Sequence, residues 1–144
     1  MNQSDTNCTL TLTKGINDLP YIAEQLSIFL KEYEILINPV NLMIEELYSN
    51  TIYYGNAEPL NVNIHLKINN ETLEVVYEDN GKPFNPLIET EPPNFNQSIE
   101  DRQIGGLGIH FIKRMTDHQS YQRTNSLNQL TLKKKITPST HAKR

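Results

Sequence analysis

Glu46 and Asn50 are the first residues of the sequence whose types and spacing suggest chemistry. They are four positions apart in residues 41–54, where apolar residues recur at helical spacing, so both side chains should project at one margin of a buried face. A carboxylate can serve as a general base, and a carboxamide oxygen can bind a hard cation such as Mg²⁺. The same pair also fits the solvated edge of an ordinary helix, so it needs support from elsewhere in the chain.

Two glycine-containing segments give that support. Asp79 follows an alternating strand pattern and precedes Gly81, which allows the backbone to approach a ligand beside the carboxylate. We predict that Asp79 accepts a hydrogen bond from an amino group such as that of adenine, although Asp-x-Gly also forms simple turns. Residues 105–108 read Gly-Gly-Leu-Gly before a helical pattern, and the N–H groups of such a segment suit phosphates. Their spacing matches neither the P-loop nor the dinucleotide fingerprint.

Hydrophobic periodicity predicts the elements that position these residues. Alternation predicts strands at residues 8–13, 62–68, 73–77, 119–123 and 129–133. Helical spacing predicts helices at residues 19–34 and 41–54, and a third that the glycines open and that reaches residue 115. Residues 87–103 are expected to form a loop with room for a short helical turn. The order predicts an α+β two-layer sandwich, with a mixed, mostly antiparallel sheet and helices on one face.

Composition and charge narrow the function classes. The chain of 144 residues is expected to form one domain over residues 1–136 and a frayed tail over residues 137–144. A net charge of −4 argues against a general nucleic-acid binder. The single cysteine, Cys8, suits the reducing cytoplasm, and no segment reads as a signal peptide or a membrane span. We therefore expect a cytoplasmic protein without nucleic-acid or membrane partners.

Taken together, these segments resemble the nucleotide-binding motifs of the GHKL ATPase superfamily, which includes gyrase-type ATPases, chaperone ATPases, histidine kinases and mismatch-repair ATPases. The resemblance is carried by residues 44–50 (IEELYSN), 79–86 (DNGKPFNP), 104–110 (IGGLGIH) and 128–133 (NQLTLK). It extends by the order and spacing of elements over about residues 10–135. The chain is most similar to the small single-domain anti-sigma-factor serine/threonine kinases. That resemblance implies the Bergerat fold, the fold of histidine-kinase-like ATPases.

The resemblance also implies a role for each matching residue. Glu46 would be the general base, and Asn50 would hold Mg²⁺. Asp79 would bind the adenine amine with Gly81 giving room, and Thr131 would reach the same edge of adenine. The phosphates of ATP would lie against the glycine segment, formed by Gly105, Gly106, Leu107 and Gly108, with residues 87–103 as a lid. Arg102 would add a phosphate contact.

The implied function is that of an anti-sigma regulatory factor in transcription regulation. With ATP and Mg²⁺, such a protein phosphorylates an anti-anti-sigma (STAS-type) partner and sequesters a sigma factor, and it is expected to form a homodimer. Many relatives carry lysine three residues after the motif asparagine, where this chain has Tyr53. The resemblance therefore implies no cationic contact from that helix to phosphate.

Two alternatives stay open at this point. One is a non-catalytic ATP-binding module that holds the nucleotide only to order a surface for a protein partner, and Tyr53 is the feature that favours it. The other is a detached catalytic domain of a histidine kinase, against which the short lid argues.

Overall fold

The computed structural model describes residues 6–89 and 106–136. The strands of this part form one five-stranded sheet in the order β1-β2-β3-β5-β4, in which every pairing is antiparallel. Their bounds are β1 (Thr6–Leu12), β2 (Val62–Asn69), β3 (Thr72–Asp79), β4 (His118–Thr124) and β5 (Leu127–Lys135). The expected mixed sheet is therefore antiparallel throughout the described residues, because two hairpins, β2–β3 and β4–β5, pair along β3 and β5.

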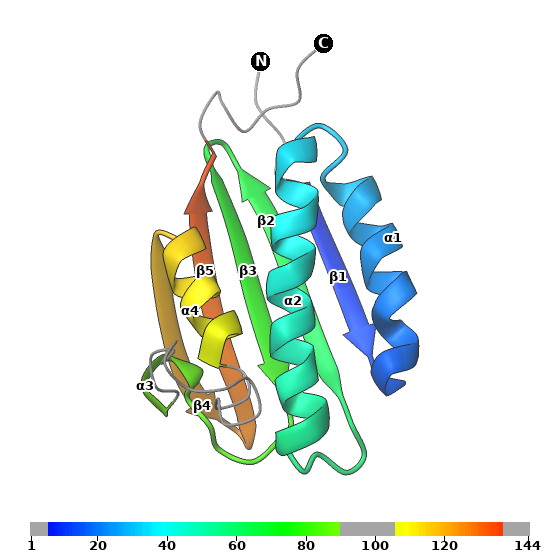
Figure 1. Ribbon diagram of the computed structural model, residues 1–144, viewed down its shortest axis with the longest axis vertical. Coiled ribbons are helices and arrows are strands. Elements are labelled where there is room, and N and C mark those ends of the chain that lie inside the picture. The colour runs from blue at the N-terminus through cyan, green and yellow to red at the C-terminus, as the bar shows by residue number, and fades with distance from the viewer. Residues whose placement is uncertain (1–5, 90–105, 137–144) are drawn as a thin grey trace.

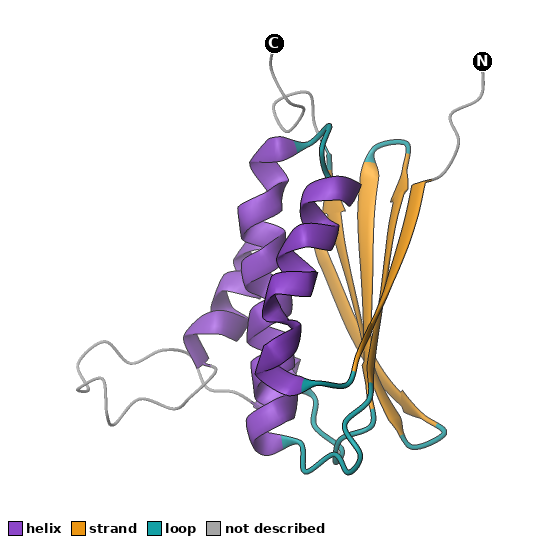
Figure 2. Cartoon of the chain, turned by 90° about the vertical axis from the view of Figure 1, so that its right-hand side faces the viewer, coloured by secondary structure: helices purple, strands orange, loops and turns teal. Residues whose placement is uncertain are grey.

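The helices cover one face of this sheet, as the side view in Figure 2 shows. They are the 3₁₀ helix η1 (Gly15–Asp18), α1 (Leu19–Phe29), α2 (Glu34–Tyr54), α3 (Pro86–Glu89) and α4 (Gly106–Met115). In Figure 1, α2 runs along the middle of the sheet, with α1 on one side and α4 on the other. The predicted two-layer α+β arrangement is confirmed. In the described residues, no helix combines the length and the apolar content that crossing a bilayer requires.

Strict alternation along the strands explains why the helices gather on one face. Except for Asp79 at the end of β3, the inward positions of β2 and β3 are apolar and buried, while their outward positions are polar or partly exposed. Outward side chains on all five strands are joined in a polar row, formed by Thr9, His65, Glu78, Gln129 and Gln122. Burying the inward face against helices is what stabilises the fold.

The second helix is longer than predicted. It begins at Glu34 rather than at residue 41, and α1 ends at Phe29 rather than near residue 34. Pro39 lies only five residues into α2, so its missing N–H removes a single hydrogen bond near the helix start. A buried stripe continues across the proline from Leu36 to Leu47 and offsets that loss.

The β4–β5 hairpin also differs from the prediction in a way that concerns the site. Its loop consists of Asn125 and Ser126, both with positive φ (55° and 66°), which is typical of a tight two-residue hairpin. The strands predicted from the sequence ended at residue 123 and resumed at residue 129, which left Asn128 outside both strands. Because the loop has only two residues, Asn128 instead lies within β5, where it pairs directly with Asp79 of β3.

Candidate functional site

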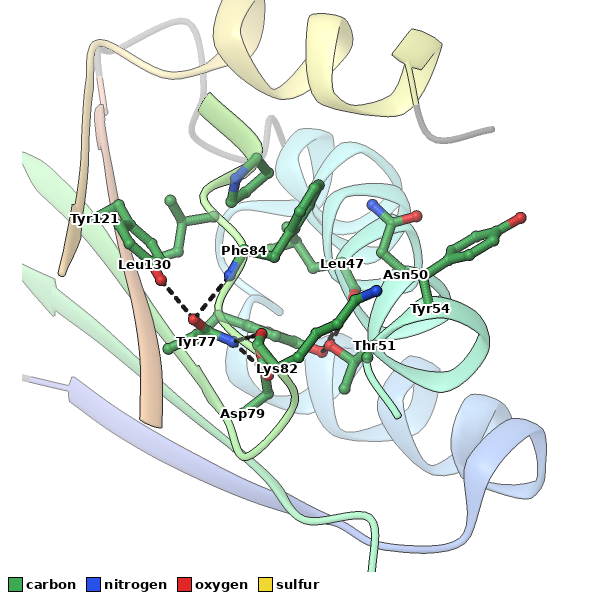
Figure 3. A pocket seen from close by; sticks show the side chains of 13 residues that line it. Leu47, Asn50, Thr51, Tyr54, Tyr77, Asp79, Lys82, Phe84, Tyr121 and Leu130 are labelled. Carbon is green, nitrogen blue, oxygen red and sulfur yellow. Dashed lines mark hydrogen bonds between the residues drawn. The ribbon is translucent and has the colours of Figure 1, made fainter. Parts of the chain in front are cut away.

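A cavity of about 420 Å³ lies between the C-terminal half of α2 and the ends of β3, β4 and β5 (Figure 3). Its size falls in the range of small-molecule sites. The walls are mainly aromatic and aliphatic, with a few polar groups, formed by Leu47, Asn50, Thr51, Tyr54, Gly55, Tyr77, Asp79, Lys82, Phe84, Pro86, Tyr121, Asn128 and Leu130. Such a lining suits a flat, largely apolar ring that carries polar groups on its edge.

The floor of the cavity is held rigid by a buried hydroxyl pair. The Tyr77 hydroxyl donates to the Leu47 carbonyl oxygen (3.1 Å) and lies 2.8 Å from the Thr51 hydroxyl, which itself donates to the same carbonyl (3.2 Å). Burial raises the pKa of Tyr77 well above its usual range, so its hydroxyl stays protonated. These bonds tie β3 to α2 beneath the site.

Asp79, the last residue of β3, presents one free carboxylate oxygen at the cavity. Its Oδ1 accepts hydrogen bonds from the Gly81 backbone N–H (2.8 Å) and from Asn128 Nδ2 (3.0 Å). Within the described residues, no group donates to Oδ2. One oxygen is therefore fixed by the protein, while the other is available to accept a hydrogen bond from an amino group of a ligand.

Gly81 is required because the loop after β3 packs tightly on the end of α2. A Cβ at this position would lie 2.9 Å from Asp79 Oδ1 and 3.1 Å from the Gly55 carbonyl oxygen. The loop is held there by Lys82 N–H, which donates to the Gly55 oxygen (2.7 Å), and by Arg123 Nη1, which donates to the Gly81 oxygen (2.9 Å). The absence of a side chain at Gly81 therefore leaves space for the Asp79 carboxylate and for the end of α2.

Asn128 is a site residue that the sequence analysis missed. Only 6% of it is exposed, and its Nδ2 also donates to the Lys82 carbonyl oxygen (2.8 Å). Its Oδ1 accepts hydrogen bonds from the Phe84 N–H (3.3 Å) and from the Tyr121 hydroxyl. A polar residue in register with Leu130 and Leu132 was the available signal, because alternation places all three on the helix-facing side.

The structure contradicts the expectation for Thr131. Thr131 pairs with Val76 and Ser120, and it alternates with the buried Leu130 and Leu132, so its side chain lies on the sheet face away from the helices. It does not line the cavity. The β5 residue that meets Asp79 is Asn128, three positions earlier in the chain.

Replacing Asn128 by alanine is expected to destabilise the fold and to weaken ligand binding together. The change leaves the Phe84 N–H and the Lys82 carbonyl without their amide partner, and Asp79 Oδ1 keeps the Gly81 N–H but loses the Asn128 amide. We expect a loss of about 1–3 kcal/mol in the free energy of unfolding. Urea denaturation measures it. Gln122→Ala is the matched control, because the side-chain amide of Gln122 makes its hydrogen bond on the outer face of the sheet. An equal loss of unfolding free energy in both variants would contradict the role of Asn128.

Glu46 and Asn50 both lie on the side of α2 that faces α4. Asn50 lines the cavity together with Asp79, so the structure brings these two predicted residues to one site. Glu46 lies one helical turn earlier, outside the cavity lining, and its carboxylate packs against Gly108 in the first turn of α4. A Cβ at residue 108 would overlap that carboxylate, so the glycine makes this contact possible.

The remaining predicted residues belong to the glycine segment and the lid. Gly106 and Leu107 form the first turn of α4, beside Gly108. Arg102 and Gly105 lie outside the described residues, as does most of the predicted lid. The described start of that lid is a short helix, α3 (Pro86–Glu89), and the Lys113 ammonium of α4 donates to its Leu87 carbonyl oxygen (2.6 Å).

The pKa of Glu46 gives a prediction for stability against pH. Burial, and then the negative charge of Glu45, raise the Glu46 pKa above its ordinary value of 4.5. The folded protein therefore holds this proton more tightly than the unfolded chain does, and stability falls as pH rises from 4.5 through the folded-state pKa. Glu46→Gln should raise the melting temperature at pH 8, with a gain that shrinks toward pH 4.5. Glu24→Gln on α1 is the control; a gain independent of pH would contradict this account.

Comparisons with known proteins bear on the family of this chain. Residues 28–134 match the family model of the histidine kinase-like ATPase domain. The chain is 29% identical, over 101 residues, to the serine/threonine-protein kinase BtrW of Bordetella bronchiseptica, covering 69% of this chain and 70% of that protein.

A solved structure shows the same fold. It is the Acinetobacter baumannii histidine kinase AdeS, with a TM-score of 0.53 and 13% identity over 90% of this chain and 68% of that chain. The family match spans most of the sequence and includes every described residue of the cavity. The protein therefore belongs to the histidine kinase-like ATPase domain family and is an ATP-binding, kinase-like module.

Proposed function

We propose that this protein is an ATP-dependent serine/threonine protein kinase and anti-sigma regulatory factor, which phosphorylates an anti-anti-sigma partner and sequesters a sigma factor. The observation that carries the proposal is the convergence of Asp79 and Asn50 on one cavity, with the Glu46 carboxylate one turn further along α2 against α4. Support for the substrate type comes from the relative BtrW, which is named a serine/threonine-protein kinase. A cytoplasmic homodimer is part of the same proposal.

The free oxygen of Asp79 would receive the adenine amine, and the aromatic walls of the cavity would hold the purine ring. The phosphates would then run past Asn50 toward the first turn of α4, where backbone N–H groups favour anions. Asn50 would hold Mg²⁺, which when bound supplies positive charge to the phosphates. Within the part of the chain that the structure describes, no three acidic, histidine or cysteine side chains form a metal-ligand cluster.

Glu46 would act at the far end of this path. Its half-buried carboxylate accepts the proton of the partner's serine or threonine hydroxyl while that oxygen forms a bond to the γ-phosphorus. The bond from that phosphorus to the bridging oxygen breaks, and ADP leaves. The raised pKa of Glu46 makes it a stronger base than an exposed glutamate, which suits this role.

The experiment is transfer of radiolabelled γ-phosphate from ATP to candidate anti-anti-sigma partners. Alkali-labile, acid-stable label on a serine or threonine is the expected result. Label that is stable to alkali and lost in acid would instead indicate phosphohistidine and the detached histidine-kinase alternative. Bound ATP that stays intact with every partner would favour the non-catalytic module. Co-elution with a sigma factor in the presence of ATP tests sequestration separately.

A further inference from the structure

One charged residue of the cavity has no assigned role. Among the described residues that line it, Lys82 alone carries a positive charge, and Asp79 alone carries a negative charge. The Lys82 side chain is exposed, and the structure shows no ion pair for its ammonium with any described residue. Figure 3 shows this side chain extending toward α2, on the side where Asn50 and Tyr54 project.

The backbone of Lys82 is fixed on both sides. Its N–H donates to the Gly55 carbonyl oxygen at the end of α2 (2.7 Å), and its own carbonyl oxygen accepts from Asn128 Nδ2 (2.8 Å). These two bonds determine where the side chain starts. Because neither bond involves the ammonium, a change of the side chain should leave the loop in place.

The opposite wall offers no cation of its own. The sequence of α2 (Glu34–Tyr54) contains neither lysine nor arginine, and its only charged residues are carboxylates. Lys82 lines the same cavity as Asp79 and Asn50, so a ligand that reaches from Asp79 to Asn50 shares this cavity with the Lys82 ammonium. If that ligand carries phosphates, an ammonium that has no partner among the described residues would make charge-assisted hydrogen bonds to them, which are stronger than neutral ones.

We propose that Lys82 binds the phosphate chain of the nucleotide from the β3 side of the cavity and makes the site prefer nucleoside di- and triphosphates over the nucleoside. The inference rests on the proposed function in one respect, that a nucleotide binds in this cavity. The cationic contact to phosphate then comes from the loop after β3, because α2 contains neither lysine nor arginine.

The test is the affinity of ATP, ADP and adenosine for the full chain, measured by calorimetry. Lys82→Gln should weaken ATP and ADP by about tenfold, as expected for the loss of a charge-assisted hydrogen bond, and leave adenosine unchanged. Lys82→Arg should keep most of the ATP affinity. Lys31→Gln, which removes an exposed charge in the turn after α1, should bind all three ligands as the wild type does. The salt dependence of ATP binding should also become shallower in Lys82→Gln.

Two results would overturn the inference alone. An equal loss of ATP and adenosine affinity would show that Lys82 supports the loop rather than the phosphates, and unchanged ATP affinity would show that it makes no contact. Failure of the wild-type protein to bind any of the three ligands would instead refute the nucleotide site, and with it the proposed function.

Discussion

Replacing Glu46 by glutamine is expected to lower phosphoryl transfer by about 10²–10⁴-fold, the contribution of a positioned general base. Glutamine keeps the shape of the side chain that packs against Gly108 but cannot take a proton. ATP affinity should change little, because Glu46 does not line the cavity. Single-turnover transfer to the partner, at saturating ATP, measures the rate.

The matched control is Glu45→Gln, which removes the same charge one position away. Glu45 accepts a hydrogen bond from Asn41 Nδ2 (2.9 Å) and acts on Glu46 only through its charge, so Glu45→Gln should lower transfer far less than Glu46→Gln does. Transfer at the wild-type rate by Glu46→Gln would show that another group takes the proton. Wild-type transfer should also decline as pH falls through the Glu46 pKa, which lies above the ordinary glutamate value.

Replacing Asp79 by asparagine is expected to weaken ATP binding by about 1–3 kcal/mol, or roughly 5- to 150-fold. Oδ1 accepts hydrogen bonds from Gly81 N–H and Asn128 Nδ2, and Oδ2 is to accept one from adenine. Both oxygens of Asp79 therefore act as acceptors. The side-chain amide of asparagine can lie in two orientations, and in each of them its NH₂ group faces a hydrogen-bond donor, either the Gly81 and Asn128 groups or the adenine amine. Competition binding of ATP against GTP measures the change, because guanine has a carbonyl oxygen where adenine has its amine.

Wild-type protein should prefer ATP over GTP, and Asp79→Asn should lose most of that preference. Glu78→Gln is the control, since Glu78 lies on the outer face of β3 and accepts from Gln129 Nε2 (2.6 Å). If Asp79→Asn bound ATP as tightly as the wild type, the adenine contact would have to be assigned elsewhere.

Local patterns in the sequence predicted most of the fold. The alternation of Val62, Ile64, Leu66 and Ile68 fixed the inward face of β2, and the structure confirms each as buried. Helical spacing placed Glu46 and Asn50 on one edge of α2. The alternating pattern of residues 73–77 placed Asp79 at the end of a strand. These features depend on residues close in sequence, where periodicity is informative.

The errors arose where tertiary contacts decide. The start of α2 was predicted too late because proline disfavours the interior of a helix. In the structure, burial of the apolar stripe on both sides of Pro39 outweighs that preference. In β5, Thr131 was chosen by resemblance, whereas the two-residue turn at Asn125 and Ser126 puts Asn128 in register with Asp79. The register of a strand decides which face every side chain reaches.

Two contacts of the site had no local signal at all. Glu46 meets Gly108 only because α2 packs beside α4, and Lys82 reaches the cavity only because its loop docks on Gly55. An exposed lysine in a turn is unremarkable in a sequence read alone. Its position in the lining of a mainly apolar and aromatic cavity, together with Asp79 and Asn50, is what indicates a role for it.

A crystal structure of the full chain with Mg²⁺ and a non-hydrolysable ATP analogue tests the central claim most directly. We predict that the adenine amine lies within hydrogen-bond distance of Asp79 Oδ2, with the phosphates passing Asn50 toward the first turn of α4. A nucleotide bound outside this cavity, or one whose base points away from Asp79, would contradict the account.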